Sequence, residues 1–152
     1  MTMKIFKGLT HAGWRFWNEY GNPCSFKNGE VCIDTKSHIN QNAIYKETVE
    51  ESTGAFDKNG ELIFTGDIIE NTFEDGNKEF LQVIFNKNIC AFELVELKTR
   101  EHLPLSKTDA YISEVLGNKH GVLKNDGGYL AQGLPKIDLR KKKKCKKQRD
   151  CL

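Results

Sequence analysis

The stretch TGAFDKNGELIFTGDIIENTF, residues 53–73, carries the densest run of β-structure signals in the chain. Two tight turns, DKNG and TGD, flank the short apolar segment ELIF, and a second apolar segment, DIIENTF, follows at once. Asp57 and Gly60 suit the first and fourth positions of a type I turn, whereas the Asn59–Gly60 pair would suit a type I′ hairpin. Gly66 supplies the backbone freedom for the second reversal. We therefore expect TGAF and ELIF to pair or to bend sharply.

Further short β segments lie on both sides of this stretch. KIFKGL and GWRFWNEYG are separated by the turn-prone THAG, and alternation puts Trp14 and Phe16 on one face and Trp17 on the other. EDGNKE predicts a hairpin loop before FLQVIF, and AYISEVLGN predicts either a last strand or a short helical turn leading into one. The pattern predicts a mainly β fold with minor α content. We expect a small β-barrel, Src-homology-like core with an N-terminal β-hairpin region.

Charge divides the chain into two parts. The whole chain has a formal charge of +2, but the segment from Lys136 to Asp150 holds nine Lys or Arg against two Asp, which leaves −5 for residues 1–135. From about residue 122 the sequence is first Gly-containing and then Lys-rich, with few apolar residues to bury. We therefore predict a β domain over residues 1–121 and a flexible basic C-terminal extension over residues 122–152.

The motifs of common enzymes are missing from the sequence. It contains no GxSxG, no P-loop, no Rossmann fingerprint and no CxxC pair. Asp57 and Asp67 stand in or beside turns, where a carboxylate usually bonds the nearby backbone. They would hold a cation only if the fold brought them together, and a calcium site takes roughly six to eight oxygen ligands. We predict a protein that is not an enzyme, with no catalytic residue, metal ligand or cofactor.

The basic extension is the main argument for nucleic-acid binding. Lysine and arginine placed against phosphates release counterions, which gives affinity without sequence preference. No aromatic residue interleaves residues 136–152, so base stacking is not expected there. The alternative is a solvated tail without a ligand. The candidate nucleic-acid-binding residues are Arg140, Lys141, Lys142, Lys143, Lys144, Lys146, Lys147 and Arg149.

Four aromatic residues near the N-terminus form a candidate protein-binding surface: Trp14, Trp17, Tyr20 and Phe26. Small barrels often present aromatics and sheet edges to a peptide or another protein. Such residues are also common in cores, and stacking on nucleic-acid bases is a further alternative.

The opening stretch resembles the signature of the YopX family of phage and prophage proteins, whose members carry a segment of the form TGLKDKNGKEIYEGDIV. FKGLTHAGWRFW, YKETVEESTG, QVIF and EVLGN also resemble family segments in the same order. The similarity covers about residues 4–18 and 45–118, and it departs at AF before Asp57, at Thr65 and at KHG after EVLGN. The signature turns, which we expect to be structural, contain Asp57, Asn59, Gly60, Gly66, Asp67, Gly117 and Asn118.

The resemblance implies a compact β-barrel core and a phage setting, and it implies no catalytic mechanism. We therefore expect a phage-associated, non-catalytic accessory protein that binds a host or phage protein, in host takeover or anti-defence. Sequence-independent nucleic-acid binding through the extension is the alternative. No apolar run reaches membrane-spanning length, and the start shows no export signal, so we expect no membrane partner and a location in the bacterial cytoplasm. The sequence is also compatible with a homo-oligomer, because the edge strands of a sheet can pair between two copies of a chain.

Overall fold

A computed structural model describes residues 3–120 of the protein. Strands account for most of the ordered elements, which confirms the predicted mainly β class with minor α content. The strands and helices are β1 (Ile5–Thr10), β2 (Gly13–Asn18), β3 (Cys24–Lys27), β4 (Glu30–Ile33), the 3₁₀ turns η1 (Gln41–Ala43) and η2 (Lys46–Thr48), β5 (Glu50–Phe56), β6 (Leu62–Phe64), β7 (Asp67–Thr72), β8 (Lys78–Asn86), β9 (Ala91–Glu96), β10 (His102–Pro104), α1 (Lys107–Ile112) and β11 (Ser113–Asn118).

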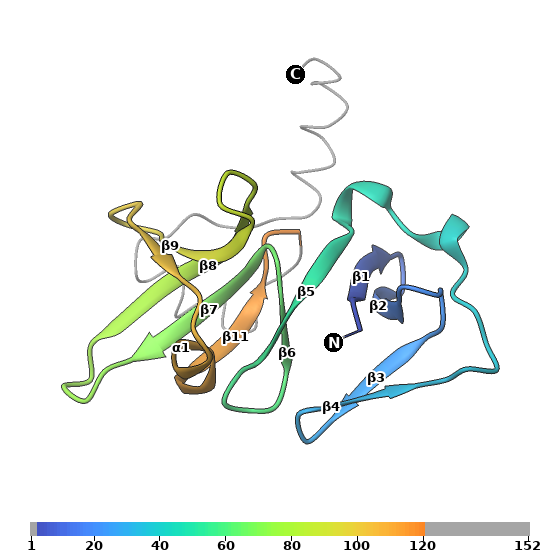
Figure 1. The fold of residues 1–152 in the computed structure, drawn as a ribbon, viewed down its shortest axis with the longest axis horizontal. Coiled ribbons are helices and arrows are strands. Elements are labelled where there is room, and N and C mark those ends of the chain that lie inside the picture. Colours follow the sequence, from blue (N-terminus) through green and yellow to red (C-terminus); the bar gives the residue numbers. More distant parts are fainter. Residues whose placement is uncertain (1–2, 121–152) are drawn as a thin grey trace, which may run out of the picture.

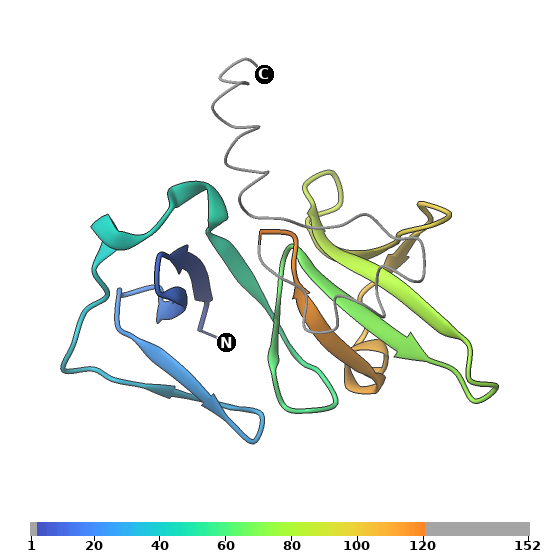
Figure 2. The same cartoon turned by 180° about the vertical axis from the view of Figure 1, so that it is seen from behind.

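Within the described residues the strands form two larger sheets and a separate hairpin. The four-stranded sheet has the order β2-β1-β5-β6, the five-stranded sheet has the order β10-β9-β8-β7-β11, and β3 pairs with β4. The fold is a strongly curled half-barrel, in agreement with the predicted small barrel-like core. The β5–β6 ribbon lies between the five-stranded sheet and the N-terminal strands (Figure 1), and the view from behind shows the same division (Figure 2).

The predicted hairpins are present. β1 and β2 pair antiparallel from Ile5↔Asn18 to Thr10↔Gly13, so a two-residue turn joins them. β7 and β8 pair across the predicted EDGNKE loop. The segment AYISEVLGN contains the end of α1 followed directly by β11, which is the second of the two predicted arrangements.

The first turn of the opening stretch is held by one carboxylate. The backbone oxygen of Asp57 accepts from the Gly60 N–H at 3.0 Å, and its carboxylate accepts from the backbone N–H groups of Asn59 and Glu61 at 2.9 Å each. The second carboxylate oxygen accepts from the Val115 N–H at 2.9 Å, which ties the turn to β11. Only Gly60 of this loop has a positive φ, +78°. The turn is therefore type I followed by a left-handed glycine, and not type I′.

Strand β6 is buried on both faces, which explains why the short segment ELIF is so apolar. Leu62 and Phe64 point to a cluster that includes Ile5 of β1. Ile63 points the other way, into the core beneath the five-stranded sheet, where it joins Leu81 and its neighbours. Because side chains alternate along a strand, three residues supply both hydrophobic clusters.

Candidate functional site

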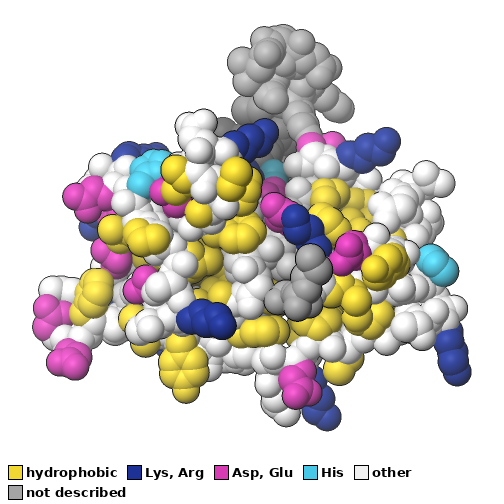
Figure 3. Space-filling view, viewed as in Figure 1, with side chains coloured by type: hydrophobic (Ala, Val, Ile, Leu, Met, Phe, Trp, Pro, Cys, Tyr) yellow, Lys and Arg dark blue, Asp and Glu magenta, His cyan; other side chains and the backbone are white. Residues whose placement is uncertain are grey.

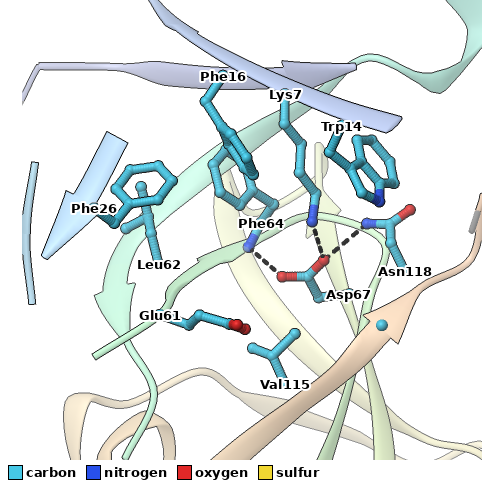
Figure 4. Close-up of a pocket in the computed structure, with 11 residues that line it drawn as sticks. Lys7, Trp14, Phe16, Phe26, Glu61, Leu62, Phe64, Asp67, Val115 and Asn118 are labelled. Atoms are coloured by element: carbon cyan, nitrogen blue, oxygen red, sulfur yellow. Dashed lines mark hydrogen bonds and ion pairs between the residues drawn. The ribbon is translucent and has the colours of Figure 1, made fainter. Parts of the chain in front are cut away.

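A cavity of about 480 Å³ lies between the N-terminal strands, β6 and the adjoining ends of β7 and β11. Figure 4 shows its side chains converging from these elements. In the space-filling view, hydrophobic side chains lie over both halves of the molecule with charged groups among them (Figure 3). The apolar wall consists of Trp14, Phe16, Phe26, Leu62, Phe64 and Val115. The polar lining side chains are Lys7, Glu61, Asp67 and Asn118.

Three phenyl rings from different strands pack together to form one wall. Phe16 of β2 and Phe26 of β3 meet edge to face, with ring centroids 4.9 Å apart and planes at 84°. Phe64 of β6 lies 5.7 Å from Phe16 and 6.3 Å from Phe26. Edge-to-face pairs at such distances contribute about 0.5–1.5 kcal/mol each beyond burial. The wall therefore joins the β3–β4 hairpin to the β5–β6 ribbon.

The floor of the cavity is built around the buried carboxylate of Asp67, which is 0 % exposed. Its Oδ1 accepts from Lys7 Nζ at 2.8 Å and from Asn118 Nδ2 at 2.8 Å, and its Oδ2 accepts from the Phe64 N–H at 2.8 Å. The Lys7 ammonium also lies over two aromatic rings, 4.6 Å from the centroid of Trp14 and 4.8 Å from that of Phe64. Cation–π contacts of this kind strengthen when water is excluded.

Burial and hydrogen bonding act on Asp67 in opposite directions. Burial raises the pKa of the Asp67 carboxyl, while the Lys7 charge and the hydrogen bonds from Asn118 and the Phe64 N–H oppose that rise. A buried carboxylate with three donors has its hydrogen-bonding needs met within the fold. Its position favours a structural role over proton transfer to a ligand.

A family model described as YopX protein matches residues 16–121, more than half of the chain. The chain belongs to the YopX family. The match begins within β2 and runs past the end of β11, so of the N-terminal block at residues 4–18 it contains only the last three positions. A search of curated proteins found no significant match.

Two parts of the YopX signature, the Gly66–Asp67 turn and the Gly117–Asn118 pair, meet at the cavity. Gly66 has φ +80°, and a Cβ atom there would lie 3.1 Å from Asn118 Nδ2. The same Asn118 amide donates to the Thr65 carbonyl at 3.1 Å and to Asp67. Gly117 and Asn118 both line the cavity. The hydrogen bonds of Asn118 and Asp67 tie these two turns together within the fold, and no local motif in the sequence predicted that the two distant turns would touch.

Asp57 and Asp67 of the YopX signature do not form a shared site. Asp57 bonds the backbone of its own turn and Val115, whereas the bonds of Asp67 go to Lys7, Phe64 and Asn118. The nearby backbone group that Asp67 bonds is the Phe64 N–H, three residues before it in the chain. Residues 3–120 contain no group of three or more His, Cys, Asp or Glu side chains placed to hold a metal ion.

The four aromatics proposed as a protein-binding surface occupy different places. Trp14 and Phe26 line the cavity and are half-buried. Tyr20 is 68 % exposed and lies outside the cavity lining. For Trp17 the prediction of a binding surface is wrong, because the side chain is only 6 % exposed. It lies on the face of β2 opposite Trp14 and stacks on Phe6, with the ring centroids 6.2 Å apart. A single four-residue surface is therefore not formed.

A second polar cluster lies beside the cavity floor, and sequence reasoning missed it. His120 Nε2 lies 2.7 Å from Glu50 Oε2, and the Thr65 hydroxyl donates to the other Glu50 oxygen at 2.9 Å. The His120 N–H donates to Asn118 Oδ1 at 3.1 Å, so this cluster continues the Lys7–Asp67–Asn118 network. Seventy positions separate the histidine from its glutamate, and no local motif signals the pair.

The candidate nucleic-acid-binding residues between Arg140 and Arg149, and the whole predicted extension from residue 122, lie outside the described residues. Among residues 3–120, no helix has the length and apolar character needed to cross a membrane.

Proposed function

We propose that this YopX protein is a phage-associated, non-catalytic accessory protein that binds a host or phage protein through the aromatic-walled cavity. The observation that carries the proposal is the cavity itself, about 480 Å³ with four aromatic side chains in its wall. Small-molecule and cofactor pockets commonly measure roughly 300–1,000 Å³ and combine apolar walls with a few polar groups. This cavity has that composition.

The polar groups of the floor favour recognition over catalysis. A general base must come within hydrogen-bond reach of the proton that it removes. Asp67 has no exposed surface, and its two oxygens already accept bonds from Lys7, Asn118 and the Phe64 N–H. A carboxylate in this state holds the cavity in shape and is not positioned to take a proton from a ligand.

The biological setting of the proposal comes from the family and from the charge distribution. The resemblance to phage and prophage proteins favours a role in the cytoplasm of the bacterial host, in host takeover or anti-defence. The charge of −5 over residues 1–135 favours a partner with a basic surface. Among residues 3–120, β10 is an outer strand of the five-stranded sheet, and its open edge leaves room for a homo-oligomer alongside that partner.

Capture of a partner from host lysate by the full-length protein tests the proposal. Phe26→Ala opens the cavity wall, and Tyr20→Ala removes an exposed aromatic side chain outside the cavity lining. We expect wild type and Tyr20→Ala to capture the same protein and Phe26→Ala to lose it while keeping its circular dichroism spectrum. Capture that is insensitive to Phe26→Ala, or equally lost with Tyr20→Ala, would overturn a role for the cavity.

The alternative function is sequence-independent nucleic-acid binding through the Lys-rich extension. It is supported by the nine Lys or Arg residues between Lys136 and Asp150. Nucleic acid and an acidic domain repel each other, so this function would depend on the extension alone.

A further inference from the structure

The cavity has hydrogen-bond donors that the protein does not fully use. An ammonium group carries three N–H donors, and within residues 3–120 Lys7 Nζ has one hydrogen-bond acceptor, Asp67 Oδ1. The other contacts of this ammonium are the ring faces of Trp14 and Phe64, which are weaker partners than an oxygen. The indole N–H of Trp14 points toward the same floor (Figure 4). Among the hydrogen bonds of residues 3–120, none has this N–H as its donor.

The charges of the lining residues restrict which kinds of ligand could accept hydrogen bonds from these donors. The positive charge of Lys7 is balanced by Asp67 at 2.8 Å, and the Glu61 carboxylate in the lining adds a further negative charge. Because Asp67 already balances the ammonium, an anion would gain little net attraction from Lys7. A cation would meet the Lys7 ammonium, which already lies over the faces of Trp14 and Phe64. A neutral ligand with an oxygen acceptor avoids both conflicts.

The wall favours a flat ring as the body of that ligand. Phe16 and Phe26 meet edge to face at 4.9 Å, and Phe64 is tilted by 48° to Phe16, so the cavity offers both ring faces and ring edges. A further aromatic ring can add edge-to-face or offset contacts to such a set. Flat, neutral rings that carry a hydroxyl acceptor occur in proteins as tyrosine.

We propose that the cavity binds a neutral, hydroxyl-bearing aromatic ring, the side chain of a tyrosine on the protein partner. The ring lies among the phenyl groups, and its hydroxyl oxygen accepts hydrogen bonds from Lys7 Nζ and the Trp14 indole N–H. This inference rests on the proposed function, since it names what enters the cavity.

Small aromatic probes test the inference without knowledge of the partner. The chain contains two tryptophans, so its ¹H–¹⁵N spectrum has two indole signals. Trp14 lines the cavity, while Trp17 is buried on the opposite face of β2 and is an internal control. We expect p-cresol, which reproduces the tyrosine side chain, to shift the Trp14 indole signal saturably and to leave the Trp17 signal in place.

Three further probes separate ring binding from hydroxyl and charge recognition. Toluene lacks the hydroxyl, p-toluate carries a negative charge, and 4-methylbenzylamine carries a positive charge. Followed at the backbone amide of Gly117 in the lining, p-cresol is expected to bind at least about threefold more tightly than each of them, because only it is neutral and hydrogen-bonded. Equal or tighter binding of any of the three, or no shift with p-cresol, would overturn the inference.

A conservative variant shows whether the indole donor is used. Trp14→Phe keeps an aromatic ring and removes the N–H, and an unchanged Trp17 signal reports an intact fold. We expect the preference for p-cresol over toluene to fall in this variant, and an unchanged preference would exclude Trp14 as a donor in the proposed site. If Phe26-dependent partner capture persists while p-cresol fails to bind, the tyrosine inference is wrong and the proposed function stands. If p-cresol binds as expected but wild type captures no partner in a Phe26-dependent way, the cavity recognises a hydroxyl-bearing ring and the proposed function is wrong.

Discussion

The Lys7 ammonium lies 2.8 Å from the Asp67 carboxylate, although sixty positions separate the two residues in the chain. Lys7 belongs to β1 of the four-stranded sheet, and Asp67 begins β7 of the five-stranded sheet. Their side chains are 9 % and 0 % exposed. One buried ion pair therefore connects the two sheets directly beneath the cavity.

Removal of one partner from this ion pair should strongly destabilise the fold. Lys7→Met leaves the Asp67 carboxylate buried without its counter-charge, and the loss of one member of a buried pair typically costs about 3–5 kcal/mol. We expect a decrease of that size in the free energy of unfolding, measured by urea denaturation.

The matched control for this change is Lys4→Met. Lys4 forms an ion pair of the same length, 2.8 Å, with Glu51, but its side chain is 53 % exposed. Exposed pairs contribute about 0–1 kcal/mol. Similar losses for the Lys4 and Lys7 variants would contradict the importance of burial at the Lys7–Asp67 pair.

Gly66 should tolerate alanine less well than Gly54, although the two glycines have similar backbone angles. Their φ values are +80° and +84°, so alanine adds left-handed strain of roughly 1–2 kcal/mol at either position. A Cβ at Gly54 meets nothing within 4 Å, whereas one at Gly66 lies 3.1 Å from the Asn118 amide that holds Asp67. We expect Gly66→Ala to lose about 1 kcal/mol or more beyond Gly54→Ala in chemical denaturation. Equal losses would show that Asn118 moves aside freely.

Glu96 should make the stability of the fold sensitive to acid. Burial raises the pKa of this carboxyl, but hydrogen bonds from the Thr99 and Lys98 N–H groups, at 2.6 and 3.0 Å, outweigh it and lower the pKa below 4.5. A carboxyl whose folded-state pKa is lowered stabilises the fold above its unfolded pKa, and this contribution is lost as the pH falls through the folded value.

The comparison of wild type with Glu96→Gln isolates this effect. We expect the wild type to be more stable near neutral pH, and the difference to shrink as the pH falls below about 4.5, since glutamine does not titrate. Thermal melting at a series of pH values measures the difference. A difference that stays constant across the acid range would contradict the assignment.

The basic extension should account for any affinity for nucleic acid. A full-length variant in which the eight residues Arg140, Lys141, Lys142, Lys143, Lys144, Lys146, Lys147 and Arg149 become glutamine removes the phosphate contacts that would release counterions. If wild type retards DNA or RNA at about 50 mM salt, we expect this variant not to do so and unrelated sequences to bind wild type equally. The absence of retardation by wild type at that salt concentration would eliminate the alternative function.

Local chemistry predicted much of this fold. The turn at Asp57, the reversal at Gly66 and the EDGNKE hairpin loop are properties of neighbouring residues, and they appear in the structure as expected. In the segment FLQVIF, alternation predicts that Leu81, Val83 and Phe85 share a face; Leu81 and Val83 are fully buried, whereas Phe85 is 39 % exposed. Such patterns operate over a few residues, which is the range that sequence reasoning can cover.

The site depends on contacts that span most of the domain, and local reasoning could not find it. The distance between Lys7 and Asp67, the meeting of Asn118 with Gly66 and the His120–Glu50 pair all follow from how the sheets are arranged. The burial of Trp17 could not be predicted either, although the residue that covers it is nearer in the sequence. Alternation placed it opposite Trp14, but only the packing of Phe6 against it revealed that its face is covered.

The double burial of β6 has a consequence for the whole molecule. Ile63 completes one hydrophobic cluster, while Leu62 and Phe64 on the same strand complete another. Because the two clusters share β6, neither cluster can be exposed to water without also removing β6 from the other cluster. We therefore expect the domain to unfold in one cooperative transition, and a ligand that enters the cavity on one side to slow hydrogen exchange in the strands on the far side.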